Sequence, residues 1–324
     1  MKMKPSITGL ILAGVLCTYS ALAVSQAYPN KPIKLVVGYP PGGSGDFLTR
    51  ILADEMGKDL GVAVVVDNRP GAGATIATDI VAKSAADGYT LLNSTHHTIG
   101  KAIYKKLPYN PDTDFIPVSL VATGPLIVTV NPGFAVNSLR ELIAYAKANP
   151  GKLFNATSGN GSSPHLAAVL FKAVSGTDIT TVHFRGGGPA AQSLIAGETQ
   201  VMFATSPTVV QFIRAGRLKA LAVTTRLASP SLPGIPGAEE AGLPGYDSSF
   251  SFGLYLPAGT PATIVKRLHE SAARVLSRAD VRERLAAQGM DATPSKSPEE
   301  FAAQLRAEAP VWERVIREAN AGVE

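Results

Sequence analysis

Cysteine is almost absent from this chain. Of its 324 residues only Cys17 is a cysteine, so the chain after residue 27 has neither a disulfide nor a thiolate. This excludes a disulfide-stapled fold and cysteine-dependent catalysis. A chain without crosslinks has to rely on its hydrophobic core, and this one is long enough for two domains of ordinary size.

Clustered charge is missing as well. The 30 Lys and Arg residues exceed the 25 Asp and Glu residues by five, and they are scattered along the sequence. Nucleic-acid binding needs a basic stripe with interleaved aromatic residues, and none is visible. We therefore expect no nucleic-acid partner. The mild positive balance favours an anionic small molecule, although this effect is weak at physiological salt.

Enzymatic motifs are also lacking. Residues 159–163, GNGSS, do not form the Gly-x-Ser-x-Gly elbow, and residues 71–73, GAG, lack the third glycine of a dinucleotide fingerprint. His96 and His97 are adjacent without a third metal ligand at suitable spacing, so a metal pair is not expected. The sequence predicts a binding protein without cofactor or metal. An exported hydrolase that uses Ser162 or Ser163 with His165 or His183 is the less favoured alternative.

One apolar run stands at the start. Lys2 and Lys4 precede an apolar core at residues 7–16, and small-residue cleavage patterns end at Ala23 and Ala27. This arrangement is typical of a secretory signal peptide over residues 1–27, with cleavage after either alanine. A retained membrane anchor is the alternative, but the run is short of the ~20 residues that span a bilayer.

Strand-like and helix-like segments alternate along the rest of the chain. Amphipathic stripes at residues 139–146 and 166–174 predict helices between strands, and two or three further helices follow residue 261. Such alternation indicates parallel sheets with helices on both faces. The strand candidates are residues 33–37, 62–66, 89–92, 116–121, 126–130, 180–184, 201–203, 218–223 and 250–256.

The most informative stretch is residues 39–46, YPPGGSGD, between a predicted strand and a predicted helix. In open α/β sheets, ligands bind at such carboxyl ends of strands. Glycines allow close approach of the backbone, and the helix start offers free N–H groups to an anion. Because the loop has no lysine or arginine, it suits a carboxylate better than a polyphosphate.

Three further loops follow the same logic. Residues 155–165, NATSGNGSSPH, open a helix, and the alternative interpretation is a serine-rich helix cap. Residues 184–190, FRGGGPA, offer Arg185 to an anion, although a surface arginine is the usual case. Residues 93–97, NSTHH, end a predicted strand, and one of the histidines is a candidate donor to a ligand.

Several motifs together carry a family resemblance. They are PNKPI at 29–33, YPPGGSGD at 39–46, DNRPGAG at 67–73, ADGYTLL at 86–92, GNGSS with His165 and Leu166, RGGGPA at 185–190, AGRLKALAVT at 215–224, EAGLPGY at 240–246 and PAGTP at 257–261. As a set these residues resemble the Bug family, the periplasmic solute receptors of tripartite tricarboxylate transporters. The resemblance covers nearly the whole chain after residue 27.

The resemblance implies an α/β type II periplasmic-binding-protein fold, two lobes with a ligand cleft between them. Residues 28–125 plus 253–324 would form lobe 1 and residues 126–252 lobe 2. It further implies a periplasmic monomer that closes on a small di- or tricarboxylate or aromatic acid and delivers it to membrane permease subunits. The implied ligand-binding residues are Tyr39, Pro41, Gly42, Gly43, Ser44, Asp46, Thr95, His97, Thr157, Ser158, Asn160, Ser162, Ser163, His165, Arg185, Ala204 and Thr205.

Two positions depart from the family pattern. Relatives often carry Thr at the position of Gly45, so we expect a larger cleft that suits a bulkier or less polar acid. Many relatives carry Asp at the position of Ala204, and its loss argues against an amino-acid ligand. A receptor that docks onto a membrane sensor kinase instead of a permease is an alternative that the sequence leaves open.

Overall fold

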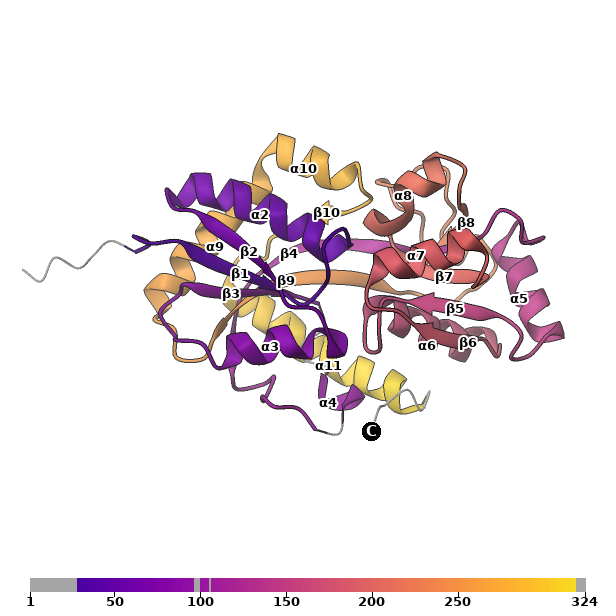
Figure 1. Cartoon of the computed structure of the whole chain (residues 1–324), viewed down its shortest axis with the longest axis horizontal. Coiled ribbons are helices and arrows are strands. Elements are labelled where there is room, and N and C mark those ends of the chain that lie inside the picture. The colour runs from indigo at the N-terminus through magenta and orange to yellow at the C-terminus, as the bar shows by residue number, and fades with distance from the viewer. Residues whose placement is uncertain (1–27, 96–99, 105, 319–324) are drawn as a thin grey trace, which may run out of the picture.

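The computed structural model describes residues 28–95, 100–104 and 106–318, and these residues form two α/β lobes side by side (Figure 1). The predicted signal peptide at residues 1–27 lies outside the described residues, as does His97. The two-lobed α/β architecture is the predicted fold class.

The first lobe begins with parallel strands in the order β2–β1–β3. Alternate residues of β1 point to opposite faces, so each face recruits its own helix. Leu35 packs in one cluster with α2, and Val36 packs in another with α3. The elements are β1 (Ile33–Val37), α2 (Ser44–Leu60), β2 (Val64–Asn68), η2 (Ala72–Ala74), α3 (Thr75–Ala82), β3 (Thr90–Ser94) and α4 (Gly100–Ile103).

The second lobe repeats this plan. Its parallel strands have the order β6–β5–β7, and helices cover both faces. Phe171 of α6 packs on one face, and Leu194 of α7 packs on the other. The elements are α5 (Leu139–Ala148), β5 (Phe154–Thr157), α6 (Ser163–Ser175), β6 (Thr180–His183), α7 (Gly187–Ala196), β7 (Val201–Thr205), α8 (Ser206–Arg214) and β8 (Lys219–Val223).

Two long strands connect the lobes. β4 (Phe115–Val130) pairs antiparallel with β9 (Ser249–Pro257) in the first lobe and continues to pair with β7 and β8 in the second. The expectation of parallel sheets is therefore wrong in part, because both sheets are mixed. The two strand candidates at 116–121 and 126–130 also form one continuous strand, since backbone pairing runs through Gly124 and Pro125.

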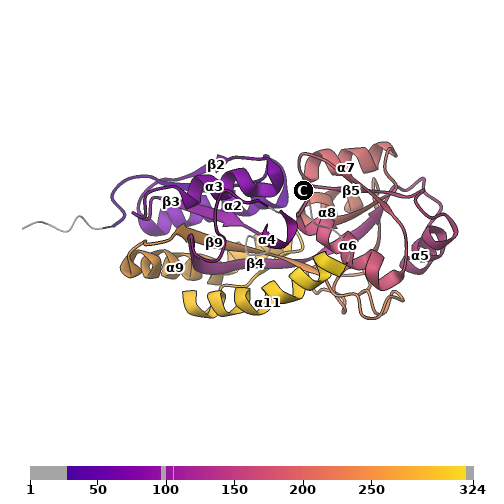
Figure 2. The same ribbon diagram turned by 90° about the horizontal axis from the view of Figure 1, so that it is seen from below.

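The described residues after β9 form three helices and a short strand on the first lobe: α9 (Ala262–Ser277), α10 (Ala279–Ala286), β10 (Asp291–Ala292) and α11 (Pro298–Glu318). Phe301 and Leu305 anchor the start of α11 beside Tyr255 of β9. Its end reaches the second lobe, where Ile316 packs in a cluster with Leu166 of α6 (Figure 2). The lobes are thus joined by β4, β9 and the end of α11.

Candidate functional site

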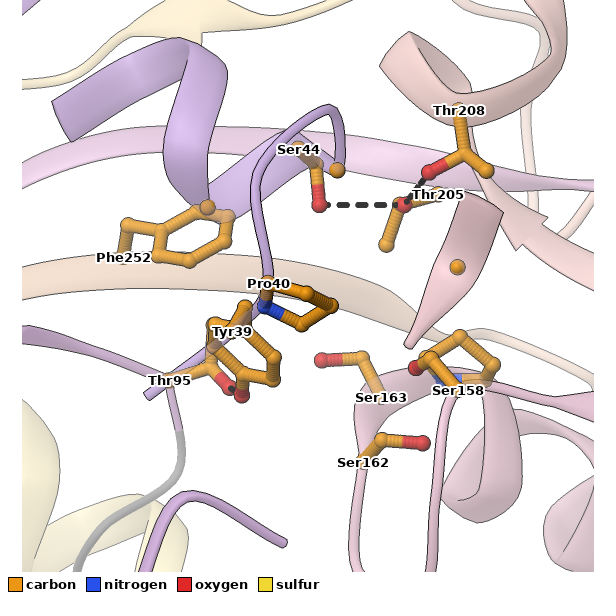
Figure 3. Close-up of a pocket in the computed structure, with 14 residues that line it drawn as sticks. Tyr39, Pro40, Ser44, Thr95, Ser158, Ser162, Ser163, Thr205, Thr208 and Phe252 are labelled. Atoms are coloured by element: carbon orange, nitrogen blue, oxygen red, sulfur yellow. Dashed lines mark hydrogen bonds between the residues drawn. The ribbon is translucent and has the colours of Figure 1, made fainter. Parts of the chain in front are cut away.

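The two predicted glycine loops face each other across the lobes. The turn after β1 and the turn after β5 both contribute to a pocket between the lobes, part of it open to solvent (Figure 3). The lining residues are Tyr39, Pro40, Gly43, Ser44, Gly45, Thr95, Ser158, Ser162, Ser163, Pro164, Gly187, Thr205, Thr208 and Phe252.

Four helices begin at this pocket. α2 and α7 start after Gly43 and Gly186, and α8 starts after Thr205, all without a side-chain hydrogen bond to the cap. Of these four helices only α6 has such a bond, in which the Ser162 hydroxyl accepts from the backbone N–H of His165. First-turn N–H groups have no partner within their own helix, and they carry the positive end of the helix dipole. The pocket therefore attracts anions through backbone groups.

None of the described lining residues carries a charge. Hydroxyl groups of Ser44, Ser158, Ser163 and Thr205 reach the pocket from different elements, as Figure 3 shows. Thr205 donates a hydrogen bond to Ser44 across the cleft at 3.1 Å and contacts Thr208 at 2.9 Å. The pocket thus offers neutral donors to an anion, without a fixed countercharge.

Asp46 supports the first loop from behind. Its carboxylate accepts hydrogen bonds from the backbone N–H of Gly42, from Arg50 and from Asn68, at 2.9–3.0 Å. Burial would raise the pKa of Asp46, but these hydrogen bonds outweigh burial and lower it. Asn68 also donates to the carbonyl of Tyr39. Asp46 is consequently not among the residues that line the pocket, and it fixes the loop that does.

An aromatic wall closes one end of the pocket. The rings of Tyr39 and Phe252 meet edge to face with 6.4 Å between centroids, and the Tyr39 hydroxyl bonds Thr95 at 2.7 Å. A Cβ atom on Gly45 would lie 2.7 Å from Cδ2 of Tyr39 and 3.4 Å from Phe252. The expectation that Gly45 enlarges the cleft is therefore wrong, because the Tyr39 ring occupies that space.

Histidines stabilise the second loop. Nδ1 of His165 accepts a hydrogen bond from the backbone N–H of Gly161 at 3.1 Å, and Nδ1 of His183 bonds the Thr157 hydroxyl at 2.8 Å. The centroids of the His165 and His183 rings lie 5.0 Å apart. Burial, aided by His183 and Lys172, lowers the pKa of His165 to about 4, and burial also lowers the pKa of His183. His165 and Thr157 thus support the loop from its inner side.

The arrangement of Ser162 differs from that of a catalytic nucleophile. Its hydroxyl donates to the carbonyl of Gly159 at 2.6 Å and accepts from the backbone N–H of His165. The imidazole of His165 is engaged with Gly161 instead. A nucleophilic serine needs the histidine ring as its base, so this geometry gives no support to the hydrolase alternative.

The structure gathers about half of the predicted ligand-binding residues at the pocket surface. The residues that line it are Tyr39, Gly43, Ser44, Thr95, Ser158, Ser162, Ser163 and Thr205. Asn160 and Arg185 line a neighbouring groove between the lobes, which shares Tyr39 and Ser158 with the pocket. Pro41 and Gly42 are exposed at the tip of the first loop.

Ala204 requires a correction. It is fully buried in β7 and packs in the apolar core of the second lobe with Ile127 and Val223. Successive strand residues point to opposite faces, and the pocket-facing position belongs to Thr205. Ala204 therefore does not line the pocket.

Five lining residues were not expected from the sequence: Pro40, Pro164, Gly187, Thr208 and Phe252. Pro40, Pro164 and Gly187 lie inside loops that were already candidates, so taking every residue of those loops would have included them. Phe252 belongs to β9 and Thr208 to the first turn of α8, and neither carries a local signal.

In the described part of the chain, no cluster of three or more His, Cys, Asp or Glu suits a metal ion. Nor does any described helix combine the length and apolar character that a bilayer span requires.

Known proteins resemble this chain over most of its length. The family model of the tripartite tricarboxylate transporter family receptor matches residues 48–321. Protein BugT of Bordetella pertussis is 37% identical over 322 residues, which cover 98% of this chain and 97% of BugT. A UPF0065 protein from the tcbD-tcbE intergenic region of a Pseudomonas strain is 38% identical over 295 residues, 90% of this chain and 88% of its own.

Solved structures show the same similarity. Rpa4515 of R. palustris with adipate has a TM-score of 0.87 at 34% identity, covering 90% of this chain and 98% of its own. MatC of Rhodopseudomonas palustris with bound malate has a TM-score of 0.84 at 33% identity, covering 89% and 100%. The periplasmic binding protein BugD has a TM-score of 0.86 at 31% identity, covering 92% and 100%. These proteins confirm the resemblance that the motifs indicate.

Proposed function

The chain belongs to the tripartite tricarboxylate transporter receptor family, and from this premise we propose that it captures a small dicarboxylate between its lobes. Members of this family are periplasmic binding proteins. Two structural neighbours are described with adipate and with malate, both dicarboxylates. The proposal gives this chain a ligand of the same chemical class.

One observation supports the proposal more than any other. Four helix starts converge on a pocket whose described lining residues carry no charge. A cationic ligand would face the positive ends of these helices, and no described lining residue offers a carboxylate to neutralise it. A dianion instead finds backbone N–H groups and hydroxyl groups that replace its hydration. The described lining residues include no charged acceptor, which also disfavours amino acids, because their ammonium group would lack a carboxylate partner.

Capture proceeds by a hinge motion of the lobes around the ligand. In this proposal residues 28–125 and 253–324 move as lobe 1 and residues 126–252 as lobe 2. The hinge is β4 with β9, because these strands pass from one lobe to the other. Closure excludes water from the pocket and strengthens the hydrogen bonds to the carboxylates, since the local dielectric constant falls.

The closed monomer then presents a surface made by both lobes to the permease subunits of a tripartite transporter. The periplasmic location of the family's members and the predicted signal peptide both support an exported location for this chain. Closure lets the permease distinguish the liganded receptor from the empty one, because only the closed form places the two lobe surfaces in the relative position that the permease binds.

A thermal-shift screen tests the ligand class. Adipate, malate, aspartate and the neutral diamide of adipic acid are each added to the purified protein. At one hundred times the dissociation constant a ligand stabilises the folded state by about 2.7 kcal/mol. We expect the midpoint of unfolding to rise with at least one of the two acids, and with neither aspartate nor the diamide. A rise with aspartate alone would contradict the proposal.

A further inference from the structure

The two lobes touch at a second place, outside the ligand pocket. There the η2 turn of the first lobe meets the loop after β5 in the second. A Cβ atom on Gly73 would lie 2.4 Å from the backbone oxygen of Asn160 and 2.3 Å from the hydroxyl oxygen of Tyr104. Only a residue without a side chain allows this approach, and Gly73 also has a φ of +59°.

Tyr104 connects the same two segments. Its hydroxyl oxygen lies 3.2 Å from the carbonyl oxygen of Ala72 in the first lobe and 3.2 Å from that of Asn160 in the second. Its ring packs against the cluster of Ile103, Leu166 and Ile316, which joins α4, α6 and the end of α11. Tyr104 therefore has polar and apolar contacts to the second lobe at once.

This contact lies outside the ligand pocket, beside it. Among the described residues that line the ligand pocket, neither Gly73 nor Tyr104 is present. Both line the neighbouring groove together with Asn160. The groups that join the lobes here are main-chain carbonyls and one phenol, and the phenol hydroxyl lies within hydrogen-bond distance of two of these carbonyls.

We propose that Gly73, Tyr104 and Asn160 form an interlobe latch that holds the closed form and thereby sets ligand affinity without touching the ligand. The inference rests on the proposed function, because affinity depends on the latch only if the lobes close on a ligand. The apparent dissociation constant equals the intrinsic one divided by the fraction of closed molecules. Weakening the latch lowers that fraction equally for every ligand, so affinities fall while their ratio stays the same.

A pair of glycine variants tests the latch. Gly73→Ala places a methyl group against Asn160, whereas Gly61→Ala adds one where no atom lies within 4 Å. Both glycines are in the first lobe and have positive φ, +59° and +74°, so the backbone strain is matched. Calorimetric titration with adipate and malate is expected to show at least about ten-fold weaker binding for Gly73→Ala. Gly61→Ala should bind like the wild type.

A pair of tyrosine variants tests the hydroxyl alone. Tyr104→Phe keeps the ring in its cluster and removes only the group that reaches Asn160. Tyr109→Phe is the control, because its hydroxyl interacts with Thr75 and Thr78 of the same lobe. We expect about five-fold weaker binding and faster ligand release for Tyr104→Phe, and no change for Tyr109→Phe.

A distance measurement reports on the latch without ligand. Exposed Lys83 and Lys147 lie on different lobes, and Lys83→Cys with Lys147→Cys in a Cys17→Ser background accepts a fluorophore pair. The mean distance should be longer in Gly73→Ala than in Gly61→Ala. Equal distances and equal affinities in the two variants would overturn the latch. If the wild type binds neither acid, the proposed function fails, and the ligand-free distance alone decides the latch.

Discussion

Acid should destabilise this protein through one buried histidine. His165 is 7% exposed and lies behind the second ligand loop, where its Nδ1 accepts the backbone N–H of Gly161. The proton of the neutral ring is therefore on Nε2. In the protonated ring both nitrogens carry a hydrogen, so Nδ1 can no longer accept the hydrogen bond from Gly161. Protonation would therefore break this bond and place a positive charge in a buried site next to His183.

The magnitude follows from the two pKa values of this group. Burial, aided by His183 and Lys172, lowers the pKa of His165 from 6.5 to about 4. Between these values the unfolded chain binds a proton that the folded chain does not, so the free energy of unfolding falls as the pH falls. The gap between the two values corresponds to roughly 3 kcal/mol, lost progressively below about pH 6.5 and complete near about pH 4.

Urea unfolding of wild type and His165→Gln at several pH values between about 7.5 and 4.5 measures this loss. The variant loses the Gly161 hydrogen bond at every pH, so it should be less stable at neutral pH. Its further loss on acidification should be smaller than that of the wild type by roughly 2–3 kcal/mol. Parallel pH profiles of the two proteins would refute the assignment, because carboxylates titrate alike in both.

Three substitutions give independent tests. Gly45→Ala should weaken dicarboxylate binding in a calorimetric titration, because the new methyl group displaces the Tyr39 ring from the pocket wall, and tighter binding would contradict this. Thr205→Val removes the 3.1 Å hydrogen bond to Ser44 and should weaken binding about five-fold, whereas unchanged affinity would show that this bond contributes nothing to closure. Glu55→Ala should lower the free energy of unfolding, measured with urea, by about 1–2 kcal/mol. The loss is modest because the cations that pair with the buried Glu55 carboxylate are exposed and can be hydrated in the variant. A larger loss would refute that reasoning.

The sequence predicts local elements of this fold well, because each strand-to-helix turn has its own pattern. The β1 turn, the helix after it and the paired loop after β5 all follow from apolar spacing and glycine placement. Strand pairing does not follow, because the pattern of β9 is the same for a parallel and an antiparallel neighbour. Whether β9 pairs in parallel or antiparallel depends on the direction in which the chain passes back from the second lobe to the first.

The pocket shows the same division. Loop residues such as Ser44 and Ser163 could be predicted, since they belong to glycine-rich turns between a predicted strand and a predicted helix. Phe252 could not, because it reaches the pocket from a strand that is distant in sequence. Ala204 and Thr205 are neighbours, and only the strand register decides which of them faces the ligand. A register cannot be deduced from five residues that are all buried.

Small-angle X-ray scattering combined with calorimetric titration tests the central claim most directly. The protein is titrated with adipate and with malate, and the radius of gyration is measured at the same ligand concentrations. We predict that the radius decreases along the binding curve and levels off at saturation, because the lobes close on the dicarboxylate. Saturable binding with an unchanged radius would contradict capture by closure.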